Sequence, residues 1–150
     1  MYIKGSQKEP FFFAMKKIEH LGIAVSDINE ANDIFKKILG KAHYKTETVE
    51  REGVSTSFFE IGESKIELLE ANNESSAIHK FIAKKGGGMH HVALAVDDIH
   101  AEMSRLKAEG FQLLSDAPLE GADNKLICFL HPKSTAGVLI ELCQDAHPHQ

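Results

Sequence analysis

The sequence predicts an α+β fold built from two βαβββ modules, and two observations support this prediction. The first is an internal repeat: residues 18–28 (IEHLGIAVSDI) align with residues 89–99 (MHHVALAVDDI) at an offset of 71, which places His20 on His91. The second is that each copy is followed by one helix-like pattern and then three strand-like patterns. Two similar halves bury their apolar faces well by pairing, and a pseudo-twofold pairing would gather equivalent residues at one centre.

The first module begins with an aliphatic, β-branched run over 18–25 that predicts a strand. Asp27 stands where a helix N-cap belongs, and the apolar stripe that follows, closed by Gly40, predicts a helix over about 28–39. Three strands are expected at 44–50, 54–61 and 65–70, separated by glycine turns.

The second module repeats this order. A strand is expected over 89–96, a helix begins after Asp98 and is closed by Gly110, and three strands are expected at 111–115, 125–130 and 137–143. The linker over 71–88 carries a short helical pattern at 75–84 and ends in three glycines, which we interpret as a hinge.

These patterns divide the chain into three parts. Residues 1–14 are interpreted as a dispensable extension, or as sequence upstream of a natural start at Met15. Residues 15–144 form one two-module domain, with module 1 at about 16–70 and module 2 at about 89–144. Residues 145–150 are expected to be a solvated tail.

Composition is that of a globular protein in water. The chain is 43% hydrophobic and 26% charged, with a net charge of −5, which gives no electrostatic case for nucleic acid or an anionic membrane as a partner. No apolar stretch is long enough to span a bilayer. The two cysteines lack CxxC spacing, and we interpret them as buried free thiols in a reducing cytoplasm.

Four residues form a candidate metal-binding set. Besides His20 and His91, the triplet Ile66-Glu67-Leu68 matches Ile140-Glu141-Leu142 at an offset of 74, so each half supplies one His and one Glu. A carboxylate in an apolar run is costly to bury without a cation. Two imidazoles and two carboxylates suit a divalent first-row metal ion.

The neighbouring residues are expected to play other parts. Gly22 shares a strand face with His20, and its small size leaves room beside the imidazole. His90 should point to the opposite face from His91 and take a hydrogen-bonded packing role there. His131 is expected to be a turn residue bonded to backbone.

Several segments carry a resemblance to a known family. They are His20-Leu-Gly-Ile-Ala-Val, Lys65-Ile-Glu-Leu-Leu, Gly87-Gly-Met-His-His, Phe129-Leu-His-Pro-Lys-Ser and Gly137-Val-Leu-Ile-Glu-Leu. Together they resemble the vicinal-oxygen-chelate superfamily and, within it, the methylmalonyl-CoA epimerase family, over about residues 17–144. The resemblance implies a curved mixed sheet around a metal site. It also implies that His20, His91 and Glu141 are metal ligands, with Glu67 where the family carries Gln or Glu.

The resemblance further implies an isomerase that interconverts the 2R and 2S epimers of methylmalonyl-CoA, in propionate metabolism, by metal-assisted proton abstraction through an enolate. Glu67 and Glu141 are then the candidate catalytic carboxylates, and Glu67 is a ligand, a base or both. The expected cofactor is a divalent ion, with Co²⁺ favoured over Mn²⁺, Ni²⁺, Zn²⁺ or Mg²⁺. The expected partner is a small CoA thioester, and a homodimer is also expected.

Two other functions stay open. A glyoxalase I (lactoylglutathione lyase) uses a His/Glu/His/Glu ligand set that fits this chain as well, and Glu67 favours it. A non-catalytic small-molecule-binding protein of the same fold is the second alternative, although it has no need of four metal-binding residues. Bound metal in the purified protein would separate the enzymes from the binding protein.

Overall fold

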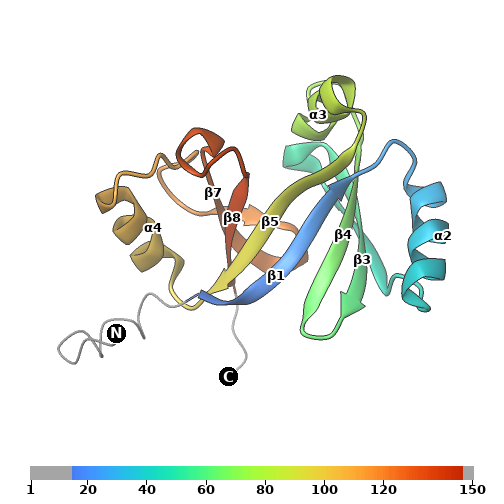
Figure 1. The fold of residues 1–150 in the computed structure, drawn as a ribbon, viewed down its shortest axis with the longest axis horizontal. Helices are drawn as coiled ribbons and strands as arrows, with labels where there is room; N and C mark the ends of the chain where they lie inside the picture. The colour runs from blue at the N-terminus through green and yellow to red at the C-terminus, as the bar shows by residue number, and fades with distance from the viewer. Residues whose placement is uncertain (1–14, 147–150) are drawn as a thin grey trace. The chain divides into compact units, whose positions relative to one another are not determined.

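The computed structural model describes residues 15–146, so the expected extension at 1–14 and most of the expected tail lie outside the described residues. Its strands are β1 (Met15–Ala24), β2 (Lys45–Val49), β3 (Val54–Ile61), β4 (Ser64–Ala71), β5 (Gly88–Val96), β6 (Leu119–Gly121), β7 (Lys125–Leu130) and β8 (Ile140–Asp145). Its α-helices are α2 (Ile28–Leu39), α3 (Ala77–Lys85) and α4 (Ile99–Ala108), and short 3-10 turns occupy Glu50–Glu52, Ala122–Asn124 and Pro132–Ser134 (Figure 1). The predicted βαβββ order is therefore confirmed in both halves. Within the described part of the chain, no helix has the length and apolar character needed to cross a membrane.

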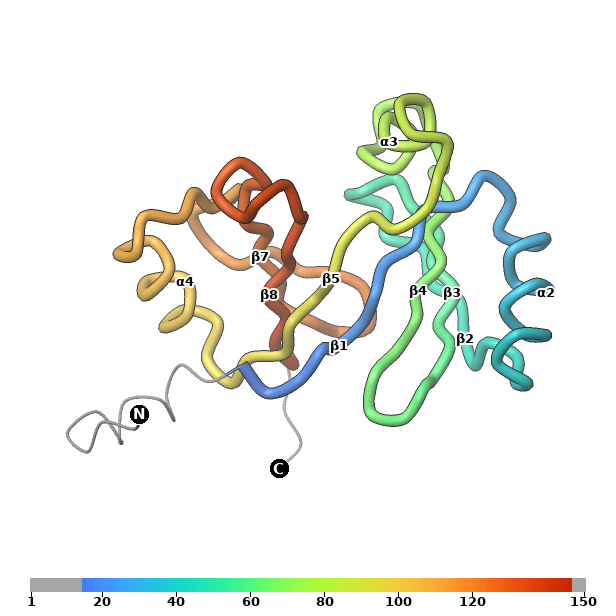
Figure 2. Tube along the Cα trace, viewed as in Figure 1, coloured from blue at the N-terminus to red at the C-terminus, as the bar shows by residue number. Residues whose placement is uncertain are grey.

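The described residues divide into two compact units: one is Glu19–Val92, and the other combines 15–18 with 93–146. In the unit Glu19–Val92 the strand order is β2-β3-β4-β1, followed by β5. β1 runs parallel to β4, whereas β3 is antiparallel to both β2 and β4 (Figure 2). This parallel pairing decides which side chains of β1 and β4 share a face.

Helix α2 covers one face of this sheet. Its residue Ala31 packs in a buried cluster with Phe59 and Leu68, and Ile23 and Ile66 pack against the same cluster. Because side chains alternate along a strand, the even-numbered residues of β1 and the odd-numbered residues of β4 project from the opposite face. That face carries the candidate ligands of this unit.

Residues at both ends delimit helices α2 and α3, and the two that delimit α2 were predicted from the sequence. The Asp27 side chain accepts hydrogen bonds from the backbone N–H groups of Asn29 and Glu30, and Gly40 ends α2 with φ 74°. Ser76 caps α3, and Gly86, the first of the three glycines, ends it with φ 81°. The start of each helix is thus set by a capping side chain, which is Asp98 for α4. Helices α2 and α3 end at a glycine with positive φ, whereas α4 ends at Glu109 (φ −79°) and Gly110 follows with φ 99°.

In the second unit the strand order is β5-β8-β7-β6, with β7 antiparallel to both neighbours. The strand predicted at 111–115 is wrong: this segment makes only an isolated bridge from Leu113 to Leu130. The reason is that β6, which the sequence did not predict, already pairs with Lys125–Ile127 of β7. Only the far end of β7 remains for the segment, through bonds such as Leu114 N–H to Phe129 O (2.9 Å).

The last strand also differs in its start. The sequence predicts it from Gly137, but β8 begins at Ile140 because Ala136 (φ 57°) and Gly137 (φ 86°) form a turn with positive φ. Glu141 still lies in this strand, paired in register with Phe129 of β7.

Candidate metal centre

The parallel register of β1 and β4 brings polar side chains to one face. His20 pairs with Lys65, and Gly22 pairs with Glu67. Residues paired in register point to the same face, so all four lie on the face opposite α2. Local alternation therefore explains why an imidazole and a carboxylate 47 positions apart in the sequence meet.

The imidazoles of His20 and His91 face each other within this unit. Their Nε2 atoms are 3.0 Å apart, the rings are perpendicular to within a few degrees (85°), and both residues are buried. The sequence prediction that the repeat unites these two histidines is consistent with this geometry. At this distance a hydrogen on either Nε2 can be donated to the other.

The 3.0 Å spacing also fits a shared metal ion. Bonds from nitrogen to a first-row ion are about 2.1 Å long, so two that meet at a right angle place their nitrogens about 3.0 Å apart, and tetrahedral bonds place them about 3.4 Å apart. A small outward movement covers this whole range. The donor pair therefore suits an octahedral or a tetrahedral ion.

Gly22 makes the approach of His91 possible. A Cβ atom at this position would lie 2.1 Å from Cε1, 2.5 Å from Nδ1 and 2.6 Å from Nε2 of His91. The space that the sequence assigned to a ligand beside Gly22 is thus filled by the imidazole of His91 itself.

Each imidazole is held at its other nitrogen. His20 Nδ1 lies 2.6 Å from Glu19 Oε1 and 3.1 Å from Glu67 Oε2. His91 Nδ1 lies 2.9 Å from Nδ1 of His90, whose ring meets the Phe81 ring edge to face at 4.9 Å. The sequence predicted a hydrogen-bonded packing role for His90 on the opposite face, and it did not foresee that the partner would be His91.

Glu19 and Lys65 are members of the site that the sequence did not indicate. Lys65 Nζ lies 2.9 Å from Glu19 Oε2 and 3.9 Å from Glu67 Oε2, and its side chain is 12% exposed. Burial alone would raise the pKa of the Glu19 carboxyl, but the hydrogen bonds to His20 and Lys65 outweigh it and lower this pKa to about 2. Glu19 is therefore a carboxylate at neutral pH.

The two candidate carboxylates are both buried. Glu67 is 5% exposed, and its Oε2 lies on the Nδ1 side of His20, away from the Nε2 atoms through which the imidazoles meet. Glu141 is 4% exposed and belongs to the other unit. Their ligand and base roles therefore stay predictions.

The remaining predicted residues have local roles. The His131 side chain accepts a hydrogen bond from Lys133 N–H (3.1 Å) at the start of a 3-10 turn, which confirms the turn role expected for it.

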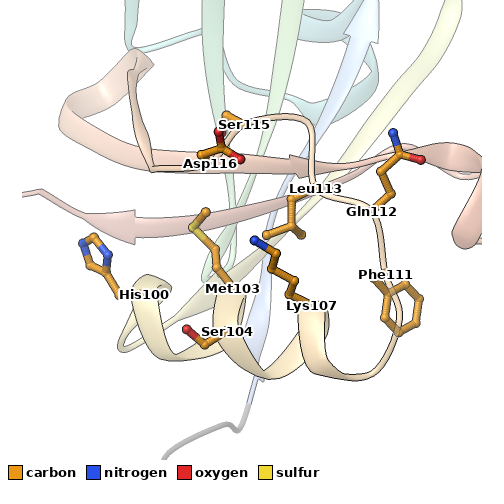
Figure 3. A pocket seen from close by; sticks show the side chains of 9 residues that line it. All are labelled: His100, Met103, Ser104, Lys107, Phe111, Gln112, Leu113, Ser115 and Asp116. Carbon is orange, nitrogen blue, oxygen red and sulfur yellow. The ribbon is translucent and has the colours of Figure 1, made fainter.

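An open cavity of about 350 Å³ lies in the second unit, between α4 and the segment 111–116 (Figure 3). Its lining includes His100, Met103, Lys107 and Asp116, and none of the four predicted ligands is among its lining residues.

Comparison with known proteins identifies the family. Residues 19–129 match the family model described as Glyoxalase/Bleomycin resistance protein/Dioxygenase superfamily, and the chain belongs to this superfamily. The matched segment includes His20, Glu67 and His91 and ends before Glu141.

Two similar proteins and one similar solved structure are named as methylmalonyl-CoA epimerases. The chain is 40% identical over 129 residues to the mitochondrial methylmalonyl-CoA epimerase of Homo sapiens, covering 85% of this chain and 73% of the relative. It is 38% identical over 130 residues to the ethylmalonyl-CoA/methylmalonyl-CoA epimerase of Cereibacter sphaeroides, covering 85% and 97%. A solved methylmalonyl-CoA epimerase in complex with methylmalonyl-CoA and NH4+ superposes with a TM-score of 0.85 at 34% identity, covering 89% of this chain and 96% of that one.

Proposed function

We propose that this protein is a metal-dependent epimerase that interconverts the 2R and 2S forms of methylmalonyl-CoA. The observation that carries the proposal is the buried pair His20 and His91, whose Nε2 atoms meet at 3.0 Å in a chain that is about two-fifths identical to methylmalonyl-CoA epimerases over most of its length. The fold match to an epimerase bound to methylmalonyl-CoA supports a CoA thioester as the substrate.

We propose that His20, His91, Glu67 and Glu141 hold the ion. The two imidazoles offer Nε2 lone pairs on one side, and the carboxylates offset the charge of a divalent cation. The bound ion supplies Lewis acidity, which makes the C2–H of a malonyl-type thioester more acidic. The ligand role of Glu141 rests on its repeat relation to Glu67 and on its burial.

Epimerisation also requires proton transfer on both faces of a planar enolate. One base removes the C2 proton, and an acid on the other face returns one. We assign these roles to Glu67 and Glu141 because the repeat supplies one such carboxylate from each half. Each half of the repeat would then supply the group that acts on one face of the enolate.

Single carboxamide variants test this assignment. Glu67→Gln and Glu141→Gln should each lower the rate of 2R formation from (2S)-methylmalonyl-CoA by at least about 100-fold, since general acid–base groups typically contribute 10²–10⁴-fold. The control is Glu63→Gln, an exposed turn carboxylate between β3 and β4 that should leave the rate unchanged. A normal rate in Glu67→Gln would remove that residue from proton transfer.

Glyoxalase I remains the second candidate because Glu67 completes a His/Glu/His/Glu set. Its substrate is the hemithioacetal of methylglyoxal and glutathione. Lactoylglutathione formation by a protein that leaves methylmalonyl-CoA unchanged would replace the epimerase proposal with this one.

Three finer assignments belong to the proposal. Cobalt is the favoured ion, because mixed nitrogen and oxygen ligation suits it, although such ligation also suits its neighbours. The cytoplasm is the favoured compartment, since both cysteines are free thiols. A homodimer is the favoured assembly, and light scattering behind size-exclusion chromatography measures it directly.

A further inference from the structure

We propose that Glu19, held in place by Lys65, is a positioning residue that fixes the tautomer and orientation of His20 so that its Nε2 lone pair faces the ion. This inference rests on the metal site proposed above. It adds two residues, neither of which was indicated by the repeat of His and Glu.

The contacts form a continuous line within one unit. Glu19 Oε1 lies 2.6 Å from His20 Nδ1, and Glu19 Oε2 lies 2.9 Å from Lys65 Nζ, so each carboxylate oxygen has its own partner. All three side chains are almost fully buried, with 7%, 6% and 12% of their surfaces exposed, respectively for Glu19, His20 and Lys65. Short contacts in such a setting restrict the ring much more than a solvent-exposed pair would.

The chemistry of the imidazole explains how the contact between Glu19 and His20 Nδ1 affects Nε2. A neutral imidazole carries one N–H, and a carboxylate can only accept, so the hydrogen of His20 belongs on Nδ1. Nε2 then presents a lone pair towards the point where His91 also presents its Nε2. An acceptor at the second nitrogen of a ligand histidine both orients the ring and makes it a better donor to a metal.

Lys65 keeps this carboxylate in place. Glu19 and Glu67 both approach His20 Nδ1, at 2.6 and 3.1 Å, and two buried carboxylates so close together repel each other. Lys65 lies within 4 Å of both and offsets part of that repulsion. Its place is fixed by the β1–β4 register, in which it pairs with His20.

The repeat provides an independent parallel. Glu19 and His90 are equivalent positions at the offset of 71, and His90 contacts Nδ1 of His91 at 2.9 Å. In both halves, therefore, the residue that precedes the histidine holds its Nδ1. Nδ1 is the ring nitrogen nearest the backbone, so a sequence neighbour reaches it while Nε2 remains for distant partners.

The variants Glu19→Gln and Lys65→Met test the inference. Lys45→Met is the matched control, because Lys45 and Lys65 both lie over the Phe58 ring (4.8 and 5.7 Å from its centroid). Lys65 pairs with Glu19 (2.9 Å), whereas Lys45 pairs with Glu47 (3.7 Å). Urea unfolding first establishes that each variant is folded. Co²⁺ affinity is then measured by competition with a chelator, and ¹H–¹⁵N spectra of the metal-free protein report the His20 tautomer.

We expect Glu19→Gln to weaken Co²⁺ binding by about 10–100-fold, the usual effect of removing a residue that hydrogen-bonds to a metal ligand. Lys65→Met should also weaken Co²⁺ binding, and Lys45→Met should leave it unchanged. Wild-type His20, assigned by the signal lost in His20→Asn, should carry its hydrogen on Nδ1, and Glu19→Gln should show mixed tautomers. A wild-type hydrogen on Nε2, or Co²⁺ affinity in Glu19→Gln within twofold of wild type, would overturn the inference and leave the metal site intact. A wild-type protein that binds no Co²⁺ would overturn the metal site, and this inference with it.

Discussion

Replacing Gly22 by alanine puts a methyl carbon into space that the His91 imidazole occupies. The new Cβ would lie 2.1 Å from Cε1 of His91, whereas ordinary van der Waals contact begins at 3.4 Å, so the ring must withdraw by at least about 1.3 Å. Metal–ligand distances tolerate deviations of about 0.2 Å. The displaced imidazole can then no longer share an ion with His20, and Co²⁺ affinity should fall by more than about 10-fold.

A double-mutant cycle in urea separates this clash from the usual effect of alanine. Gly22→Ala should destabilise the wild-type protein by about 1–3 kcal/mol, the typical cost of overpacking. In the His91→Ala background the obstructing ring is gone, so the same change should stabilise the protein by about 0.5–1 kcal/mol, because alanine loses less backbone entropy than glycine. Equal effects in the two backgrounds, or wild-type Co²⁺ affinity in Gly22→Ala, would refute the packing of His91 against Gly22.

Two further predictions concern single features of the fold. Asp27→Ala should lower the free energy of unfolding by about 1 kcal/mol, because it removes the cap of α2. The control is Asp33→Ala, which removes an exposed partner of Lys37 and should change the free energy of unfolding by less than about 0.5 kcal/mol. Equal urea midpoints for the two variants would contradict the capping role. Burial raises the pKa of the Cys128 thiol, so less of this thiol is thiolate at any given pH. Native protein at pH 8–9 should therefore react slowly with iodoacetamide at Cys128 and at the buried Cys143, whereas urea-unfolded protein should react fast. Rapid alkylation of the native protein would contradict the burial of these thiols.

Local sequence patterns predicted the order of elements well because the determinants are themselves local. The Asp27 cap and the Gly40 end of α2 depend on a few neighbouring residues, and periodicity located most strands. Pairing is not local. The segment 111–115 was interpreted as strand-like, but β6 pairs with the part of β7 that this segment would need.

The site shows the same division. The repeat identified His20 and His91, whose Nε2 atoms the structure brings together, because equivalent residues of paired halves converge. Strand alternation, however, predicts that Glu19 and His90 point away from the histidines that follow them. One signal was available in the sequence: Glu19 and His90 are equivalent at the offset of 71, and each precedes a candidate ligand histidine. This signal can be used only if the two ring nitrogens are considered separately, with Nδ1 for the preceding residue and Nε2 for the metal.

The central claim is that the protein epimerises methylmalonyl-CoA with the help of a metal ion held by His20 and His91. The most direct test incubates metal-stripped protein, with and without Co²⁺, with (2S)-methylmalonyl-CoA in D₂O and follows deuterium at C2 together with the 2R epimer. We predict deuterium incorporation and 2R formation that depend on added Co²⁺ and are lost in His91→Ala. Absence of exchange in protein that has bound Co²⁺ would contradict the claim and direct the next assay to methylglyoxal and glutathione.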